Sequence, residues 1–338
     1  MTILDVIVPV HVDTEQKYKY FDRMLNSIVC QELEYYSEVV NFCFVLDNNS
    51  SQMNNKIKEL IEKRMLSRID KFNYKVHQVF FKDAGLSRQF GIDKTESEYI
   101  TFMDADDQYY NNKAIQDCLE AIEECRGCDY IATTIAKGYQ EGGKITTEDK
   151  TFSMKGNLYG YIIDRCYINQ NDIKFVGDMK LYEDTYYTDI VKILAETNTT
   201  INKPTYIWMQ NEESMTHSIS NDQLILEDID GYLKYSSNIL NYFETTRPDK
   251  LLVQIQIFIV LSYFKLIEWK RTGVAEDKLF EICLELRNIM KLYNYVQLSY
   301  RAMKAQVKTK LKEDNSLTKG EINTGIKEFK QFYKEITQ

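Results

Sequence analysis

Residues 99–107 read YITFMDADD, a short apolar run followed at once by three carboxylates in four residues. The run at 99–103 has the β-branched and aromatic residues of a buried strand. Asp104, Asp106 and Asp107 then lie in the turn after it. Carboxylates this close together repel one another and usually require a cation, and oxygen ligands suit Mg²⁺ or Mn²⁺. The stretch therefore predicts a strand with an acidic, metal-binding turn at its carboxyl end.

Short β-rich runs alternate with helical periodicity on both sides of this strand. Further strands are expected at 4–10, 39–46, 76–81 and 130–136, and helices at 18–28, 57–65, 85–94 and 113–125. This alternation predicts a mostly parallel sheet flanked by helices, an α/β architecture. Ligands of such sheets bind beyond the carboxyl ends of the strands. The polar turn that begins at Asp47 and the cluster at Asp104 should therefore lie at one site.

The pattern changes near residue 220. Before it we expect a loop or hairpin at 137–155, a helix that opens at 182–184 and a strand at 206–209. After it nearly every residue has helical periodicity, with breaks near Pro248, Gly273 and Gly320. The sequence thus predicts an α/β domain at 1–220 and an all-α domain at 221–338. The apolar run at 251–264 is too short for a bilayer and contains two Gln, so it predicts a buried helix and no transmembrane segment.

Composition excludes several classes of protein. With 44% hydrophobic and 28% charged residues, the chain is a globular mixture rather than a disordered one. Its net charge of −9 argues against a broad nucleic-acid-binding surface, because an acidic chain repels polyphosphate. Cysteine usage and an amino terminus without a basic leader predict reduced thiols and a cytoplasmic protein. Cys125 and Cys128 form one C-x-x-C without the second pair of a zinc site, and are expected to be ordinary thiols.

Three classes of acidic site can be tested against the cluster. An EF-hand loop starting at Asp104 would need Gly and Glu where Tyr109 and Ile115 stand. An aspartyl-phosphate phosphatase would want Thr or Val at the position of Gln108, and its cluster would lie earlier in the chain. The D-x-D signature of nucleotide-sugar glycosyltransferases remains. The plain structural alternative is a solvated turn that caps the helix at Lys113.

Five motifs in order resemble glycosyltransferase family 2, the non-processive nucleotide-sugar enzymes of the GT-A fold. The segments are 6–10 (VIVPV, similar to V-I-I-P-V-Y-N), 46–50 (LDNNS, similar to V-D-D-G-S), 84–92 (AGLSRQFGI, similar to G-L-S-x-A-R-N-x-G-I), 100–107 (ITFMDADD, similar to F-L-D-x-D-D) and 182–184 (YED, similar to a later E-D). The resemblance covers roughly residues 3 to 218. No Q-x-x-R-W motif of the membrane-embedded, processive synthases is present. His11 and Asn48 depart from the family pattern, where an aromatic residue and a second Asp are usual.

The resemblance implies a nucleotide-sugar-binding site and a divalent cation, Mn²⁺ or Mg²⁺. The residues it assigns to the nucleotide sugar are Pro9, Asp47, Asn48, Arg88, Asp104, Ala105 and Asp106. The metal ligands it implies are Asp106 first, then Asp104, with His217 as a further candidate. Arg88 should fork onto phosphate oxygens unless it forms a surface ion pair. Asp47 should accept a hydrogen bond from a ring N–H of the base, which favours a UDP-sugar donor.

The implied reaction is transfer of a sugar from a nucleoside diphosphate to a hydroxyl group. Asp184, beside Glu183, is the candidate base for the acceptor hydroxyl, and the alternative role of both is to cap a helix. With one base and no dedicated nucleophile, the reaction should invert the anomeric carbon. A nucleotidyltransferase would need a glycine-rich basic loop where residues 11–15 read HVDTE. A non-catalytic sugar-binding relative is the other alternative, although such relatives tend to lose the acidic residues retained here.

The helical half carries a cationic stripe at helical spacing, formed by Arg301, Lys304, Lys308 and Lys312. An apolar stripe of Met303, Val307 and Leu311 runs beside it. The stripe suits a glycan or anionic polyol-phosphate acceptor, or an anionic membrane surface that the protein contacts peripherally from the cytoplasm. The alternative is a solvated helix face. The apolar helices of this half could also form a homo-oligomer interface.

Overall fold

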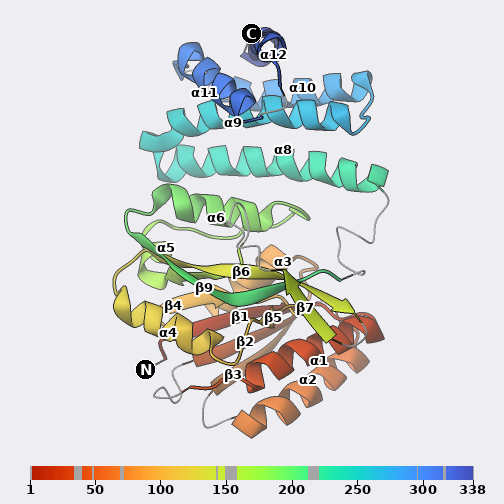
Figure 1. The fold of residues 1–338 in the computed structure, drawn as a ribbon, viewed down its shortest axis with the longest axis vertical. Coiled ribbons are helices and arrows are strands. Elements are labelled where there is room, and N and C mark those ends of the chain that lie inside the picture. The colour runs from red at the N-terminus through yellow and green to blue at the C-terminus, as the bar shows by residue number, and fades with distance from the viewer. Residues whose placement is uncertain are drawn as a thin grey trace. The chain divides into compact units, whose positions relative to one another are not determined.

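The computed structural model describes residues 2–33, 40–47, 49–68, 72–141, 144–148, 158–211, 221–294, 296–314 and 317–337. The chain divides into two compact units, Met1–Ser220 and Asn221–Gln338 (Figure 1). The first unit is built around a single sheet and contains every family motif. The second is made of helices throughout its described residues.

Four parallel strands form one half of the sheet, in the order β3-β2-β1-β4. They are β1 (Leu4–Val10), β2 (Val40–Asp47), β3 (Phe72–Val79) and β4 (Tyr99–Phe102). Nearly all residues of β1 and β2 are buried, as expected for strands covered on both faces. Val6 and Val8 belong to the core that includes Phe21 and Ile57. Ile7 instead packs against Gly91 of α3 (Ala84–Asp93), so closely that a Cβ on Gly91 would clash with it. Alternate residues of β1 therefore face different layers of helices.

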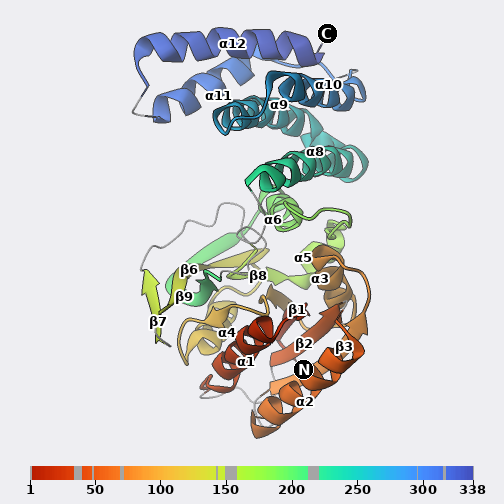
Figure 2. The ribbon, with the colours of Figure 1, turned by 90° about the vertical axis from the view of Figure 1, so that its right-hand side faces the viewer.

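The helices of this half cover the two faces of the parallel strands. They are α1 (Glu15–Val29), α2 (Ser51–Met65) and α3 (Ala84–Asp93). Figure 2 shows α1 and α2 together on one side and α3 on the other. The Ser50 side chain caps α2 by accepting a hydrogen bond from the Met53 N–H. The predicted α/β fold is confirmed in this half nearly strand by strand.

The other half of the sheet is mixed, with the order β4-β8-β6-β9-β5. Its strands are β5 (Gln108–Tyr109), β6 (Tyr130–Glu141), β8 (Tyr161–Asp164) and β9 (Asn198–Met209), and β7 (Lys144–Glu148) pairs with β6 as a hairpin. β8 runs antiparallel to both β4 and β6, and β5 runs antiparallel to β9. Because β5 has only two residues and β8 only four, periodicity did not reveal either of them. These short strands bring the second half of the unit back to the acidic turn.

The remaining helices of the first unit are η1 (Leu66–Arg68), α4 (Ala114–Glu124), α5 (Arg165–Gln170) and α6 (Glu183–Leu194). α6 opens at the predicted 182–184 segment, so Glu183 and Asp184 lie in its first turn. At the end of α4, Cys125 and Cys128 are joined by a disulfide, so the expectation of two free thiols is wrong for this pair. The three-residue spacing across a helix end brings the two Cα atoms to 5.8 Å.

The helical unit consists of α8 (Asn221–Thr246), α9 (Pro248–Arg271), α10 (Glu276–Lys291), α11 (Tyr300–Glu313) and α12 (Lys319–Thr337). The breaks predicted near Pro248 and Gly273 lie between helices, whereas Gly320 lies inside the first turn of α12. Met303, Val307 and Leu311 are buried, so the predicted apolar stripe of α11 is a core face.

Within the described residues, α9 is the helix that is long and apolar enough to cross a membrane. Of its apolar window, 44% is buried inside the structure. The Tyr263 hydroxyl donates to the Gly325 carbonyl of α12 at 2.7 Å, and Trp269 Nε1 donates to Asp228 of α8 at 2.6 Å. α9 is thus held on two sides by other helices, as a core helix is.

Candidate active site

The acidic turn after β4 and the start of α6 meet at Arg88. Its guanidinium donates to Asp104 Oδ1 at 2.9 Å and to Glu183 Oε1 at 3.1 Å. Arg88 lies on α3, Asp104 follows β4 and Glu183 begins α6, so three motifs that are separate in the sequence share one ion-pair network. The structure thus brings Arg88 and Glu183, which only the family resemblance had singled out, to the acidic turn.

The Arg88 side chain is only 4% exposed, so its pairs are buried rather than superficial. Burial alone lowers the pKa of a guanidinium, but the charges of Asp104 and Glu183 outweigh it and raise the pKa of Arg88. Its Nε is buried without a hydrogen-bond partner in the described part of the chain. The predicted alternative of a surface ion pair is wrong in its location, because this pair is inside the protein. Contact with a donor phosphate stays a prediction.

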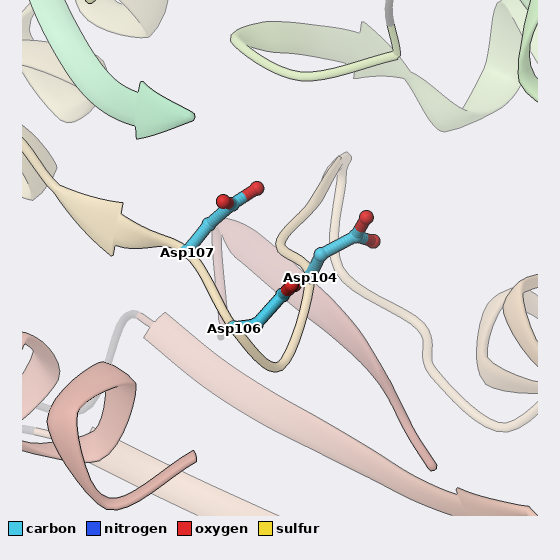
Figure 3. A group of neighbouring side chains, drawn as sticks. All are labelled: Asp104, Asp106 and Asp107. Carbon is cyan, nitrogen blue, oxygen red and sulfur yellow. The ribbon is translucent and has the colours of Figure 1, made fainter. Parts of the chain in front are cut away.

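Three carboxylates lie close together in the loop between β4 and β5 (Figure 3). One oxygen from each of Asp104, Asp106 and Asp107 lies within 4.8 Å of the others. Asp107 is 2% exposed and accepts hydrogen bonds from the Tyr206 hydroxyl at 2.5 Å and the Met209 N–H at 2.7 Å. Asp107 is therefore tied to β9.

Asp104 and Asp106 are held by different groups. The second oxygen of Asp104 accepts from the Tyr159 hydroxyl at 2.6 Å. Asp106 Oδ2 accepts from Asn211 Nδ2 at 2.9 Å, and its carbonyl accepts from Arg23 at 2.7 Å. Tyr159, Tyr206, Asn211 and Arg23 were not identified from the sequence. Tyrosine is too common in this chain to serve as a signal, and the roles of all four depend on long-range contacts.

The electrostatics of the turn suit a cation. Burial, and then the charge of Asp104, raises the pKa of Asp106. Burial and the neighbouring carboxylates raise the pKa of Asp107 well above its usual value. Burial and mutual repulsion thus both disfavour the ionised form of these carboxylates. A divalent cation would offset this repulsion, and the carboxylate oxygens are the hard donors that Mn²⁺ and Mg²⁺ prefer.

Asp47, at the end of β2, already has a full set of partners. Oδ1 accepts from the N–H groups of Phe81 and Lys82, and Oδ2 from the Asp83 N–H and the Ser87 hydroxyl, at 2.8 to 3.0 Å. These contacts organise the loop between β3 and α3. Hydrogen bonding to a nucleobase would have to replace or share one of these donors, so that predicted role remains a prediction.

The other predicted site residues fall into two groups. Pro9 lies near the end of β1, paired in register with Val45 of β2, and Ala105 lies in the acidic turn, packed against the core. Asn48 and His217 lie outside the described residues. His11 is placed at the same edge, where its Nδ1 lies 3.0 Å from the Asp47 carbonyl.

Glu183 and Asp184 occupy the first turn of α6, after Tyr182 with φ of 72°. Burial, together with the charge of Asp184, raises the pKa of Glu183 to about 7. Burial also raises the pKa of Asp184, although Arg88 opposes the shift. Asp184 Oδ1 accepts from the Thr185 N–H at 2.7 Å, and Oδ2 has no donor from another described residue. Asp184 thus keeps one oxygen available for a proton, as a general base requires.

The chain matches the family model "Glycosyl transferase family 2" over residues 5–190, more than half of its length. It therefore belongs to glycosyltransferase family 2 and is a glycosyltransferase that uses a nucleotide sugar. This membership sets aside the nucleotidyltransferase alternative.

Solved structures agree on the fold over nearly the whole chain. A crystal structure of S. aureus TarS 1-349 in complex with UDP-GlcNAc has a TM-score of 0.67 at 17% identity, covering 99% of this chain and 90% of that one. Crystal structures of the same TarS segment, one with UDP, have TM-scores of 0.63 at 16% identity and the same coverage. No curated protein matches the chain. The similarity confirms the GT-A-like α/β fold followed by helices.

Replacing Arg88 by Met should strongly destabilise the protein. The variant leaves Asp104 and Glu183, whose side chains are only 21% and 14% exposed, without their cation, and loss of one partner of a buried ion pair costs about 3–5 kcal/mol. Arg64→Met is the matched control, because Arg64 forms a comparable pair with Asp22 at 2.8 Å while both side chains are about one-third exposed. The control should lose about 1 kcal/mol or less. Denaturant unfolding followed by circular dichroism measures both, and equal losses would contradict the importance of burial.

Proposed function

We propose that the protein is a metal-dependent, inverting glycosyltransferase that moves a sugar from a UDP-sugar to a hydroxyl of a glycan or polyol-phosphate acceptor. One observation carries the proposal. Arg88 connects the acidic turn, at 2.9 Å from Asp104, with the helix start that presents Glu183 and Asp184, at 3.1 Å from Glu183. A donor-diphosphate site and a base for the acceptor are thus adjacent, as direct displacement at one carbon requires.

The donor proposal rests on the fold and on the carboxyl edge of the sheet. Structures of TarS with the same fold contain UDP or UDP-GlcNAc. In this chain, Pro9, Asp47 and Arg88 lie at or near the carboxyl ends of β1 and β2 and on the helix after β3. Asp47 selects a base with a ring N–H, such as uracil, when that N–H replaces one of the four hydrogen-bond donors that Asp47 now has. Asn48, which lies outside the described residues, and Ala105 are assigned to the same donor.

Asp106 is the proposed first ligand of Mn²⁺ or Mg²⁺, with Asp104 beside it and His217 as a further candidate. Asp106 Oδ1 supports this order, because it has no donor from another described residue, whereas both oxygens of Asp104 accept hydrogen bonds. When bound, the cation supplies Lewis-acid neutralisation of the leaving diphosphate. Asn211 and Arg23 hold the Asp106 side chain and backbone in place.

Asp184 is the proposed base. Its Oδ2 would take the proton from the acceptor hydroxyl as that oxygen attacks the anomeric carbon. Its raised pKa makes it a stronger base than an ordinary aspartate. Glu183 is tied to Arg88, so it orients this turn of α6 rather than competing for the proton.

UDP binding should depend on the cation and on Asp106. Titration calorimetry with UDP should show affinity that falls strongly when Mn²⁺ and Mg²⁺ are removed by a chelator, because the diphosphate then faces an uncompensated acidic turn. Asp106→Asn should reproduce that loss by about 10-fold or more while the protein stays folded. Equal UDP affinity with and without the chelator would contradict the metal assignment.

Asp184→Asn should separate binding from chemistry. The variant keeps the shape of the side chain, so UDP-sugar affinity should hold, while transfer falls by roughly 10²-fold or more with the loss of the base. In the wild type, transfer should decline on acidification at a higher pH than an ordinary aspartate gives, because Asp184 must be ionised and its pKa is raised. Asp172→Asn is the control, since Asp172 is exposed and pairs with Lys174. Wild-type transfer by Asp184→Asn would place the base elsewhere.

The acceptor proposal rests on the exposed cationic face of α11. Arg301, Lys304, Lys308 and Lys312 are all exposed, and no ion pair is found for them among the described residues. Some other cations of the helical unit are paired, for example Lys278 with Glu281. In a chain of net charge −9, such an unpaired row is suited to an anionic polymer such as a polyol phosphate.

Reversing Arg301, Lys304 and Lys308 to Glu should reduce transfer to an anionic acceptor by roughly 10-fold, since exposed ion pairs contribute up to about 1 kcal/mol each. Metal-dependent hydrolysis of the donor should not change. The control reverses Lys270, Arg271 and Lys291, which are also exposed and give the same change in net charge. If only binding to anionic vesicles falls, the partner of the stripe is a membrane surface. If neither vesicle binding nor transfer changes, the stripe is a solvated helix face.

A further inference from the structure

Two tyrosine rings stack beside the acidic turn. The ring centroids of Tyr159 and Tyr206 are 5.1 Å apart, and the ring planes differ by only 8°. Tyr206 lies in β9 and is 3% exposed, while Tyr159 lies two residues before β8. The pair therefore belongs to the mixed half of the sheet, whereas the acidic turn follows β4 of the parallel half.

Both hydroxyl groups of the pair are directed at the acidic turn. Tyr159 donates to Asp104 Oδ2 at 2.6 Å, and Tyr206 donates to Asp107 Oδ2 at 2.5 Å. The Asp104 N–H in turn donates to the Tyr206 oxygen at 3.1 Å. Hydrogen bonds from a hydroxyl to a carboxylate at these distances are short and charge-assisted. The stacked rings thus fix two of the three carboxylates in orientation.

The remaining donors complete a pattern in which one oxygen is left open. Arg88 occupies Asp104 Oδ1, and the Met209 N–H occupies Asp107 Oδ1. Asn211 occupies Asp106 Oδ2. Within the described residues, Asp106 Oδ1 is then the carboxylate oxygen of the turn that accepts no hydrogen bond from another residue. Without the two tyrosine hydroxyls, Asp104 and Asp107 would each have an oxygen without a hydrogen-bond donor, as Asp106 has.

We propose that Tyr159 and Tyr206 are positioning residues for the cation: their hydroxyls engage Asp104 and Asp107 and so reserve Asp106 as the carboxylate that meets the metal. This inference rests on the proposed function and adds to it the residues that set the geometry of the metal ligands. Without the hydroxyls, Asp104 and Asp107 can rotate, and the turn loses its single preorganised arrangement. Groups that orient metal ligands in this way typically change metal affinity by 10–100-fold when removed.

The test uses Tyr159→Phe and Tyr206→Phe, which keep the stacked rings and delete only the hydroxyls. Binding of Mn²⁺ in the presence of UDP, followed by the electron paramagnetic resonance signal of free Mn²⁺, should weaken about 10-fold in each variant. Tyr130→Phe is the control, because its ring packs on Tyr161 with centroids 5.4 Å apart and no hydrogen bond of its hydroxyl is found among the described residues. The control should bind Mn²⁺ as the wild type does.

Two further readouts distinguish positioning from a merely structural role. The rise in melting temperature on adding Mn²⁺ and UDP should shrink in the Phe variants, because that rise follows metal affinity. The Mn²⁺ concentration for half-maximal transfer should increase about 10-fold, while the rate at saturating Mn²⁺ returns close to that of the wild type.

Wild-type Mn²⁺ affinity in both Phe variants would overturn the inference and leave the proposed function intact. If the wild type itself binds no Mn²⁺ with UDP, the proposed metal dependence fails, and the positioning role fails with it. If Tyr206→Phe does not fold, the half-buried Tyr159 carries the test, and unchanged Mn²⁺ affinity in Tyr159→Phe then overturns the proposal.

Discussion

The buried guanidinium of Arg88 is the interaction on which the rest of the site depends. A buried cation is destabilising unless its charge is paired, and Asp104 and Glu183 pair the two terminal nitrogens of Arg88 here. The same contact joins the end of β4 to the start of α6, so neither acidic motif can shift without leaving a buried charge unpaired. The protein therefore holds the carboxylates of the acidic turn and its candidate base in one arrangement before any substrate binds.

The two halves of the sheet make different contributions to this arrangement. The parallel half supplies the charged groups at strand ends, namely Asp47, Arg88 and the acidic turn. The mixed half supplies neutral donors, the hydroxyls of Tyr159 and Tyr206, which orient those charges. Neutral donors satisfy a carboxylate without cancelling its charge, so the turn keeps the negative field that a cation needs.

Much of the fold was predictable because its signals are local. The strand at 4–10, the helix that follows it and the Ser50 cap all come from periodicity and capping within a few residues. The rule that parallel strands end at one edge predicted a shared site for the turn at Asp47 and the cluster at Asp104, whereas Arg88 and Glu183 were singled out only by the family resemblance. The role of Asp47 was harder to predict, because its donors at 81–87 come from a loop whose path depends on the β3–α3 connection.

The amino-acid sequence by itself determined which segments become strands and helices, and that carboxylates gather where strands end, because period, capping and strand direction are properties of short stretches. Only the tertiary structure decided which carboxylate oxygens are engaged and which stay open. Asp107 and Tyr206 are 99 residues apart, and Asp104 and Tyr159 are 55 apart. Their meeting depends on the return of β8 and β9 to the turn, in strand pairings whose register is set by packing of the whole sheet rather than by any local pattern.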